Sequence, residues 1–167
     1  MRISRLVPGV VAVILTLLPA AWAQSRKPGL YETTAKMTWD KSPFPAGMPQ
    51  GAMGGTEHTS QVCVTQEQID KFGTAPPHMR GGDCHLTNIN KTSHGMTAEM
   101  MCTGHMNGKG DLTVTWTDTD HSTSKMHFTG TMQMGPNSKP FEWTITSISS
   151  YKGPDCGSVK PLPTPKD

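Results

Sequence analysis

The sequence predicts a mainly β protein: an antiparallel meander of six to seven strands that forms a curved sheet, half-barrel or small barrel, with one short helix. Three observations lead to this prediction. Apolar and polar residues alternate along several segments that are rich in threonine and aromatic residues. Clusters of glycine, proline, asparagine and serine separate these segments. Only one segment combines helical spacing of apolar residues with helix start and stop signals.

The first strand is expected in the segment LYETTAKMTW, residues 30–39. Its odd-numbered positions, from Tyr31 to Trp39, would face the sheet interior, because successive side chains of a strand point to opposite faces. Residues 40–56, which follow, are rich in Pro, Gly and Met. Such a segment cannot bury enough apolar surface to offset its ordering entropy, so we expect a mobile loop that could cover a binding mouth.

The helix is expected after a second strand, HTSQVCV, at residues 58–64. Thr65 and Gln68 have the spacing of a capping box, in which side chain and backbone bond reciprocally across the first turn. Apolar residues follow at helical spacing, and Gly73 stands where the helix would end. These signals predict a short helix between Thr65 and Gly73.

The remaining strands complete the meander. Turns are expected at Ser93-His94-Gly95 and at Asn107-Gly108, a dipeptide typical of tight hairpins. The tail, residues 157–167, is rich in proline, and we expect it to be extended and disordered. The strands themselves are expected at about residues 84–91, 96–106, 111–117, 125–134 and 141–151.

The N-terminus predicts export. Arg2 and Arg5 precede an apolar run that is shorter than a membrane span, and Ala21-Trp22-Ala23 has the small-x-small pattern of a cleavage site. We therefore interpret residues 1–23 as a cleavable signal peptide, cut after Ala23. The mature chain would form a single domain over residues 24–156, located in the periplasm or secreted and not embedded in a membrane.

The charge of the mature chain gives no sign of a nucleic-acid partner. Removing residues 1–23 removes two arginines and no acidic residue, which leaves 13 basic and 13 acidic side chains. A protein that binds nucleic acid normally carries a clear excess of positive charge on one face. The sequence pI of about 8.4 therefore belongs partly to the signal peptide.

Four cysteines in an exported chain predict two disulfides, for which three pairings are possible. Cys84 and Cys102 are almost equally far from the turn near residue 93 and would lie on matching faces of two paired strands. We favour a bridge between them, with Cys63 paired to Cys156, over the other two pairings. No C-x-x-C motif is present, which argues against a zinc ribbon, a thioredoxin-type redox site and attached haem.

Residues 94–110 contain four methionines, two histidines and one cysteine, which raises the question of a soft-metal site. In a strand, Met96 and Cys102 would face one side, whereas Met101 and His105 would face the other. Only His94 and Met96 stay close on one side, and they are the two candidate metal ligands. Because two ligands do not make a selective site, we favour methionines that pack the sheet interior.

Two short motifs follow the N-terminal segment in order: Pro28-Gly29-Leu30-Tyr31-Glu32 and Cys63-Val64-Thr65-Gln66-Glu67. In these motifs the chain resembles a bacterial domain-of-unknown-function family, number 3617, which often has Trp in place of Tyr31 and Pro in place of Gln66. The later cysteines, the Met- and Thr-rich strands and the closing Asp155-Cys156 complete the resemblance. It covers residues 28–156 and implies a small exported protein, periplasmic in a two-membrane bacterium. It implies no activity and no functional residues.

The sequence contains no recognisable catalytic constellation, so we expect a non-enzymatic protein without catalytic residues or cofactor. The leading hypothesis is a disulfide-stapled envelope protein that binds an apolar small molecule or a protein partner, because its strands place adaptable methionine and aromatic side chains on one face. The alternative hypothesis is a periplasmic soft-metal (copper) or oxidant-handling protein that uses Met and His side chains, including His94 and Met96.

Overall fold

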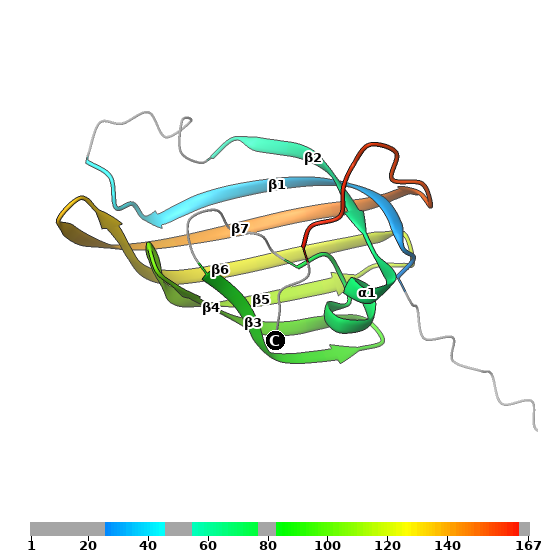
Figure 1. The fold of residues 1–167 in the computed structure, drawn as a ribbon, viewed down its shortest axis with the longest axis horizontal. Helices are drawn as coiled ribbons and strands as arrows, with labels where there is room; N and C mark the ends of the chain where they lie inside the picture. Colours follow the sequence, from blue (N-terminus) through cyan, green and yellow to red (C-terminus); the bar gives the residue numbers. More distant parts are fainter. Residues whose placement is uncertain (1–25, 46–54, 77–82, 164–167) are drawn as a thin grey trace, which may run out of the picture.

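The computed structural model describes residues 26–45, 55–76 and 83–163, and shows one antiparallel sheet of seven strands in the order β2-β1-β7-β6-β5-β4-β3 (Figure 1). The predicted curved antiparallel sheet with one short helix is confirmed for this part of the chain. In chain order, the elements are β1 (Gly29–Lys41), β2 (Glu57–Val64), α1 (Gln66–Phe72), β3 (Asp83–Thr92), β4 (Gly95–Thr103), β5 (Met106–Trp116), β6 (His121–Met134) and β7 (Asn137–Gly153).

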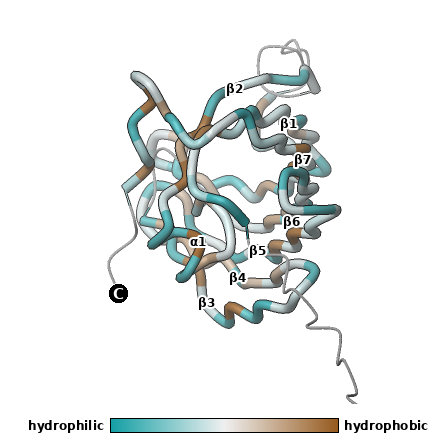
Figure 2. The backbone as a smooth tube through the Cα atoms, turned by 90° about the vertical axis from the view of Figure 1, so that its right-hand side faces the viewer, coloured by the Kyte–Doolittle hydropathy of each residue, from teal (hydrophilic) through white to brown (hydrophobic). Residues whose placement is uncertain are grey.

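The sheet curves into a half-barrel and does not close. Strands β3 to β7 form a continuous meander, whereas β1 pairs with β7 and places β2 at the far edge, opposite the other edge strand β3. Figure 2 shows the sheet in section as a curve that is open on one side, with α1 and the C-terminal segment across the opening. The concave face of the sheet is therefore covered by these two short segments.

Helix α1 forms as the sequence predicts. The Thr65 hydroxyl accepts a hydrogen bond from the Gln68 backbone N–H at 3.2 Å, and the Gln68 side-chain carbonyl accepts one from the Thr65 N–H at 3.0 Å. Gly73 ends the helix with φ of 70°, a conformation that glycine adopts without steric cost. A Cβ atom on Gly73 would also lie 2.8 Å from the Trp116 ring, so the helix end packs tightly against β5.

The predicted hairpin turn at Asn107-Gly108 is wrong. The chain turns three residues earlier, at Gly104-His105, and Asn107 belongs to β5, where its side chain bonds back to both the N–H and the C=O of Gly104. Gly108 lies in the strand opposite Gly130, where a Cβ atom would clash with the Thr129 carbonyl oxygen and lie 2.8 Å from the Phe128 ring. The glycine makes room for an aromatic ring and does not make a turn.

The sulfur-rich segment is a strand, as the alternation predicts. Met96, Met100 and Cys102 of β4 are buried, and Met101 and the following His105 are exposed.

Two disulfides tie the sheet together. Cys84 and Cys102 are register partners on β3 and β4 and are bonded to each other, and Cys63 at the end of β2 is bonded to Cys156 after β7. These are the two pairs that the spacing favoured.

The predicted signal peptide, residues 1–23, and the central part of the predicted loop, residues 46–54, lie outside the described residues. Residues 157–163 of the tail, which we expected to be disordered, lie against the domain: Val159 donates to the Cys156 carbonyl at 3.0 Å, and the Leu162 carbonyl accepts a bond from Gln68. Within the described part of the chain, no helix has the length and apolar character needed to cross a membrane.

Candidate functional site

A cavity of about 350 Å³ lies on the concave face of the sheet, between the strands and the segments that cover the opening. Its floor is built from small side chains of three neighbouring strands: Thr33 and Ala35 on β1, and serines on β6 and β7. The register places Ala35 opposite Ser147, and Ser147 opposite Ser124. Because these aligned side chains are small, they leave space where larger residues would fill the curve of the sheet.

The hydroxyl groups of this floor are paired with one another. The Thr33 and Ser149 hydroxyls lie 2.8 Å apart, and the Ser124 and Ser147 hydroxyls lie 2.7 Å apart. When a ligand displaces water, the free-energy cost is smaller for a hydroxyl that is bonded to a protein group than for one that is bonded only to water. The floor is therefore polar in composition, yet an apolar ligand could cover it at small cost.

The walls and the cover of the cavity are mainly apolar. The segment after α1 and the tail provide the cover, through Ala75, Pro76 and Leu162. The side chain of Gln68, which is 0 % exposed, donates to the Leu162 carbonyl at 2.7 Å and so fixes the tail over the opening. The walls come from β2, β5, β6 and β7, through Val62, Val64, Leu112, Val114, Met126, Trp143 and Ile145.

Arg26 borders one end of the cavity, together with Tyr31. Its guanidinium carbon lies 4.4 Å from the centre of the Tyr31 ring, a cation–π contact. Burial lowers the pKa of Arg26, an effect that Tyr31, Asp118 and Asp120 partly oppose, and burial raises the pKa of the Tyr31 hydroxyl.

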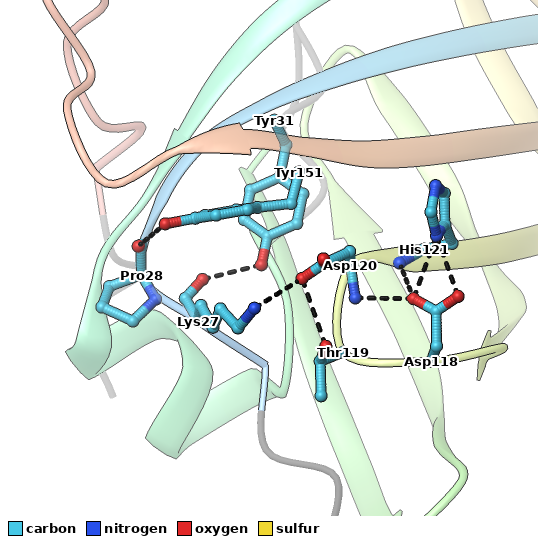
Figure 3. A network of polar contacts seen from close by, with 8 residues as sticks. All are labelled: Lys27, Pro28, Tyr31, Asp118, Thr119, Asp120, His121 and Tyr151. Atoms are coloured by element: carbon cyan, nitrogen blue, oxygen red, sulfur yellow. Dashed lines mark hydrogen bonds and ion pairs between the residues drawn. The ribbon is translucent and has the colours of Figure 1, made fainter.

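A network of polar contacts holds the N-terminal segment in this position (Figure 3). Lys27 forms an ion pair with Asp120 at 2.9 Å, and Tyr31 donates a hydrogen bond to the Lys27 carbonyl at 2.7 Å. The rings of Tyr31 and Tyr151 meet edge to face, 5.2 Å apart, which joins β1 to β7 at this end of the sheet. Residues 26–28 are thereby tied to the turn between β5 and β6.

The turn itself is rigidified by one carboxylate. Asp118 accepts hydrogen bonds from the backbone N–H groups of Asp120 and His121, each at 2.7 Å, and pairs with the His121 ring. These bonds hold the pKa of Asp118 below its usual range, and the bond from Lys27 does the same for Asp120. Both carboxylates are therefore ionised and already partnered at neutral pH.

The structure separates the two predicted metal candidates. Met96 is buried in the core at 2 % exposure, whereas His94 is exposed in the turn between β3 and β4, where its Nδ1 lies 2.8 Å from the Ser93 hydroxyl. Both border one shallow hollow on the sheet, but its other lining residues are glycine, valine, threonine and asparagine, so no third soft donor joins them there.

The outer face carries a group that sequence reasoning missed. One ligand atom each from Asp40, His127 and Glu142 lies within 4.8 Å of the others, a spacing that could hold a metal ion. His127 and Glu142 are already paired at 2.8 Å, and Asp40 accepts a hydrogen bond from Thr144 at 2.8 Å. These contacts account for the arrangement as hydrogen-bonded surface side chains on β1, β6 and β7. All three residues lie at outward positions of their strands. In the sequence they therefore look like ordinary surface residues, which is why the group was missed.

The lining of the cavity combines apolar side chains and hydroxyl groups with one guanidinium. Among the residues that line it, Arg26 and Tyr31 are the ones with titratable side chains, and no histidine, cysteine or carboxylate is present to activate a serine hydroxyl. Its floor of serines was not foreseen, although the small residues at alternate positions of residues 122–124 and 147–149 could have signalled it.

Comparisons with known proteins agree with the sequence resemblance. No curated protein and no solved structure matches the chain. The model of one family, described as a protein of unknown function (DUF3617), matches residues 26–156, which include the whole sheet, the helix and all four cysteines. The chain belongs to this DUF3617 family.

Proposed function

We propose that the protein is an exported, non-enzymatic component of the cell envelope that binds a small apolar molecule in the cavity on the concave face. The observation that supports this most directly is the cavity itself: about 350 Å³ of space between a floor of small side chains and a cover of apolar residues. Cavities of small-molecule sites range from about 300 to 1,000 Å³, so this one suits a small ligand.

The balance of interactions favours an apolar ligand. Each Å² of apolar surface that leaves water contributes about 25 cal/mol, and most of the cavity wall is apolar. Four of the floor hydroxyls form two hydrogen-bonded pairs, so covering them costs less than covering hydroxyls that are bonded only to water. The two disulfides are compatible with the oxidising conditions outside the cytoplasm.

A cavity-filling substitution tests the proposal. Ala35 lines the cavity, so Ala35→Leu would add three carbon atoms to it without removing a side-chain hydrogen bond. The matched control is Thr38→Leu, an exposed position on the other face of β1. Binding of octan-1-ol to the purified protein, followed by thermal shift and by native mass spectrometry, should be lost in Ala35→Leu and kept in Thr38→Leu. Equal binding by both variants, or none by the unmodified protein, would refute it.

A second candidate function is soft-metal handling. One observation supports it: His94 and Met96 border the same hollow. A selective copper site needs at least one further soft ligand. Titration of the oxidised protein with Cu(I) against a competing chelator tests this candidate. Binding tighter than about micromolar that is lost in Met96→Leu would establish it, and weaker binding would remove it.

A further inference from the structure

Arg26 is a buried cation, and one of its guanidinium nitrogens has no hydrogen-bond partner among the described residues. It is 5 % exposed, and its Nη1 makes no hydrogen bond within the described chain. A guanidinium has five N–H donors and stays charged at any physiological pH. A buried charge of this kind is costly unless an opposite charge or acceptor meets it, so an unpartnered N–H beside a cavity points to a ligand group.

The acidic residues nearby do not supply that partner. Asp118 and Asp120 are the two carboxylates whose charges act on Arg26. Asp120 is bonded to Lys27 and Thr119, and Asp118 is bonded to His121 and to two backbone N–H groups. No ion pair joins either of them to Arg26 in the described residues. Their charges partly offset the effect of burial on the pKa of Arg26 but provide no acceptor for its Nη1 group.

The Tyr31 ring fixes the guanidinium but does not satisfy it. The cation–π contact at 4.4 Å holds the group over the ring, and the ring is held by the hydrogen bond from its own hydroxyl to the Lys27 carbonyl. A cation–π contact uses the positive charge and the face of the guanidinium and accepts none of its N–H bonds directionally. Arg26 is thus positioned in advance for an acceptor at the end of the cavity.

We infer that the ligand of the cavity is an amphiphile with a single negative charge, an apolar chain that ends in a carboxylate, and that Arg26 binds this carboxylate. The inference rests on the proposed function and names the class of its ligand. Arg26 is the one cationic side chain among those that line the cavity, which matches one negative charge. At about 30 Å³ for each water-sized group, the volume admits roughly a dozen non-hydrogen atoms, the size of a medium-chain carboxylate.

A set of three eight-carbon probes tests the charge preference. Octanoate, octan-1-ol and octylammonium share one apolar chain and differ in the charge of the end group. Binding to the purified protein with both disulfides formed is measured by calorimetry near neutral pH, where the carboxyl is ionised. Because a charge-assisted hydrogen bond to a guanidinium strengthens binding, octanoate should bind about 10- to 100-fold tighter than octan-1-ol. Octylammonium should bind more weakly than the alcohol.

Substitutions then assign the preference to Arg26. Arg26→Met keeps the apolar stem and should bring the affinity for octanoate down to that for octan-1-ol, while the affinity for the alcohol stays the same. Arg26→Lys should keep part of the preference. The matched control is Lys152→Met, which also removes one positive charge but from an exposed ion pair with Glu32 that does not line the cavity. This control should leave the preference unchanged.

The outcomes separate the inference from the proposed function. If octan-1-ol binds in the cavity but octanoate binds no tighter, or if the preference survives Arg26→Met, the inference is overturned and the proposed function stands. If neither probe binds at about millimolar concentration, both fail. If Ala35→Leu abolishes binding of octanoate and Arg26→Met abolishes only its advantage over the alcohol, the inference is supported. The unchanged affinity for octan-1-ol also shows that Arg26→Met is folded.

Discussion

Both halves of the concave face show the same alternation of inward and outward side chains, but one half is tightly packed and the other contains a cavity. In one half, the ring of Phe128 lies stacked between Phe141 at 5.7 Å and Trp143 at 5.2 Å, so large side chains fill the curve of the sheet. In the other half, the same strands β6 and β7 place Ser124 and Ser147 at equivalent inward positions and leave a cavity. Side-chain volume at alternate positions, and not a change of backbone, separates the packed core from the cavity.

The largest expected effect on stability comes from removing a large side chain from the packed half of the concave face. Phe128 is 0 % exposed, so Phe128→Ala would remove a ring from a packed stack and leave a void. We expect a loss of about 3–5 kcal/mol in the free energy of unfolding, measured by urea denaturation. Thr129→Ala, at the neighbouring exposed position, should change it by about 0.5 kcal/mol or less. A similar loss for both variants would show that the stack is not the main core.

The bond between Cys63 and Cys156 should matter next, because it anchors the cover of the empty half. Replacing both cysteines by alanine is expected to cost about 2–4 kcal/mol, since the bond closes a loop with a sequence separation of 93. The tail at residues 157–163 would then be held at Leu162 alone, so limited proteolysis should cut it faster. Replacing Cys84 and Cys102, a pair inside one hairpin, should leave the tail protected.

A smaller effect is expected from Gln68, which links the helix start to the tail. Gln68→Ala removes the bond to the Leu162 carbonyl and half of the capping box, so we expect a loss of about 1–3 kcal/mol. The exchange of a bound probe should also become faster, as measured by line shapes in NMR titrations. Gln66→Ala, on the exposed side of the same helix, is the control. Unchanged exchange in Gln68→Ala would mean that the tail does not limit access.

The smallest expected effect is on the pH dependence of stability, through the turn between β5 and β6. The folded-state pKa values of Asp118 and Asp120 lie below their ordinary value of 3.8, so the unfolded chain takes up protons first as the pH falls. The stability that these groups contribute is present above about pH 4 and is lost below it. Both residues are exposed, so the change should be slight. In acid denaturation curves, Asp120→Asn should reduce the loss of stability below about pH 4. The control variant Asp155→Asn should not.

The parts of the fold that follow from local chemistry could be predicted from the sequence. The capping box of Thr65 and Gln68 acts within one turn, and the alternation in β4 decides which side chains are buried without reference to other strands. The prediction of a turn at Asn107-Gly108 was wrong because the need for a glycine at position 108 comes from the close approach of the next strand, at Phe128, Thr129 and Gly130. Local turn chemistry gave way to a tertiary contact.

The candidate site could not be predicted, because a cavity depends on register between distant strands. Thr33 and Ser149, whose hydroxyls meet in its floor, are separated by 116 positions in the sequence. Arg26 gave no signal either: it looks like any basic residue near an N-terminus until the chain is folded and its side chain is buried. Sequence patterning identified the apolar face of the sheet but not the point at which that face is left unfilled.

The pairing of β1 with β7 has a consequence for how the protein matures. These strands come from opposite ends of the domain, and the binding cavity takes its floor from both. A chain that emerges N-terminus first can therefore form the meander of β3 to β6 early, but it completes the cavity only after its last strand arrives. Contacts between remote segments also form slowly. Cys156, just beyond that strand, can then join Cys63 and lock the finished arrangement, so the cavity is completed only at the end of folding.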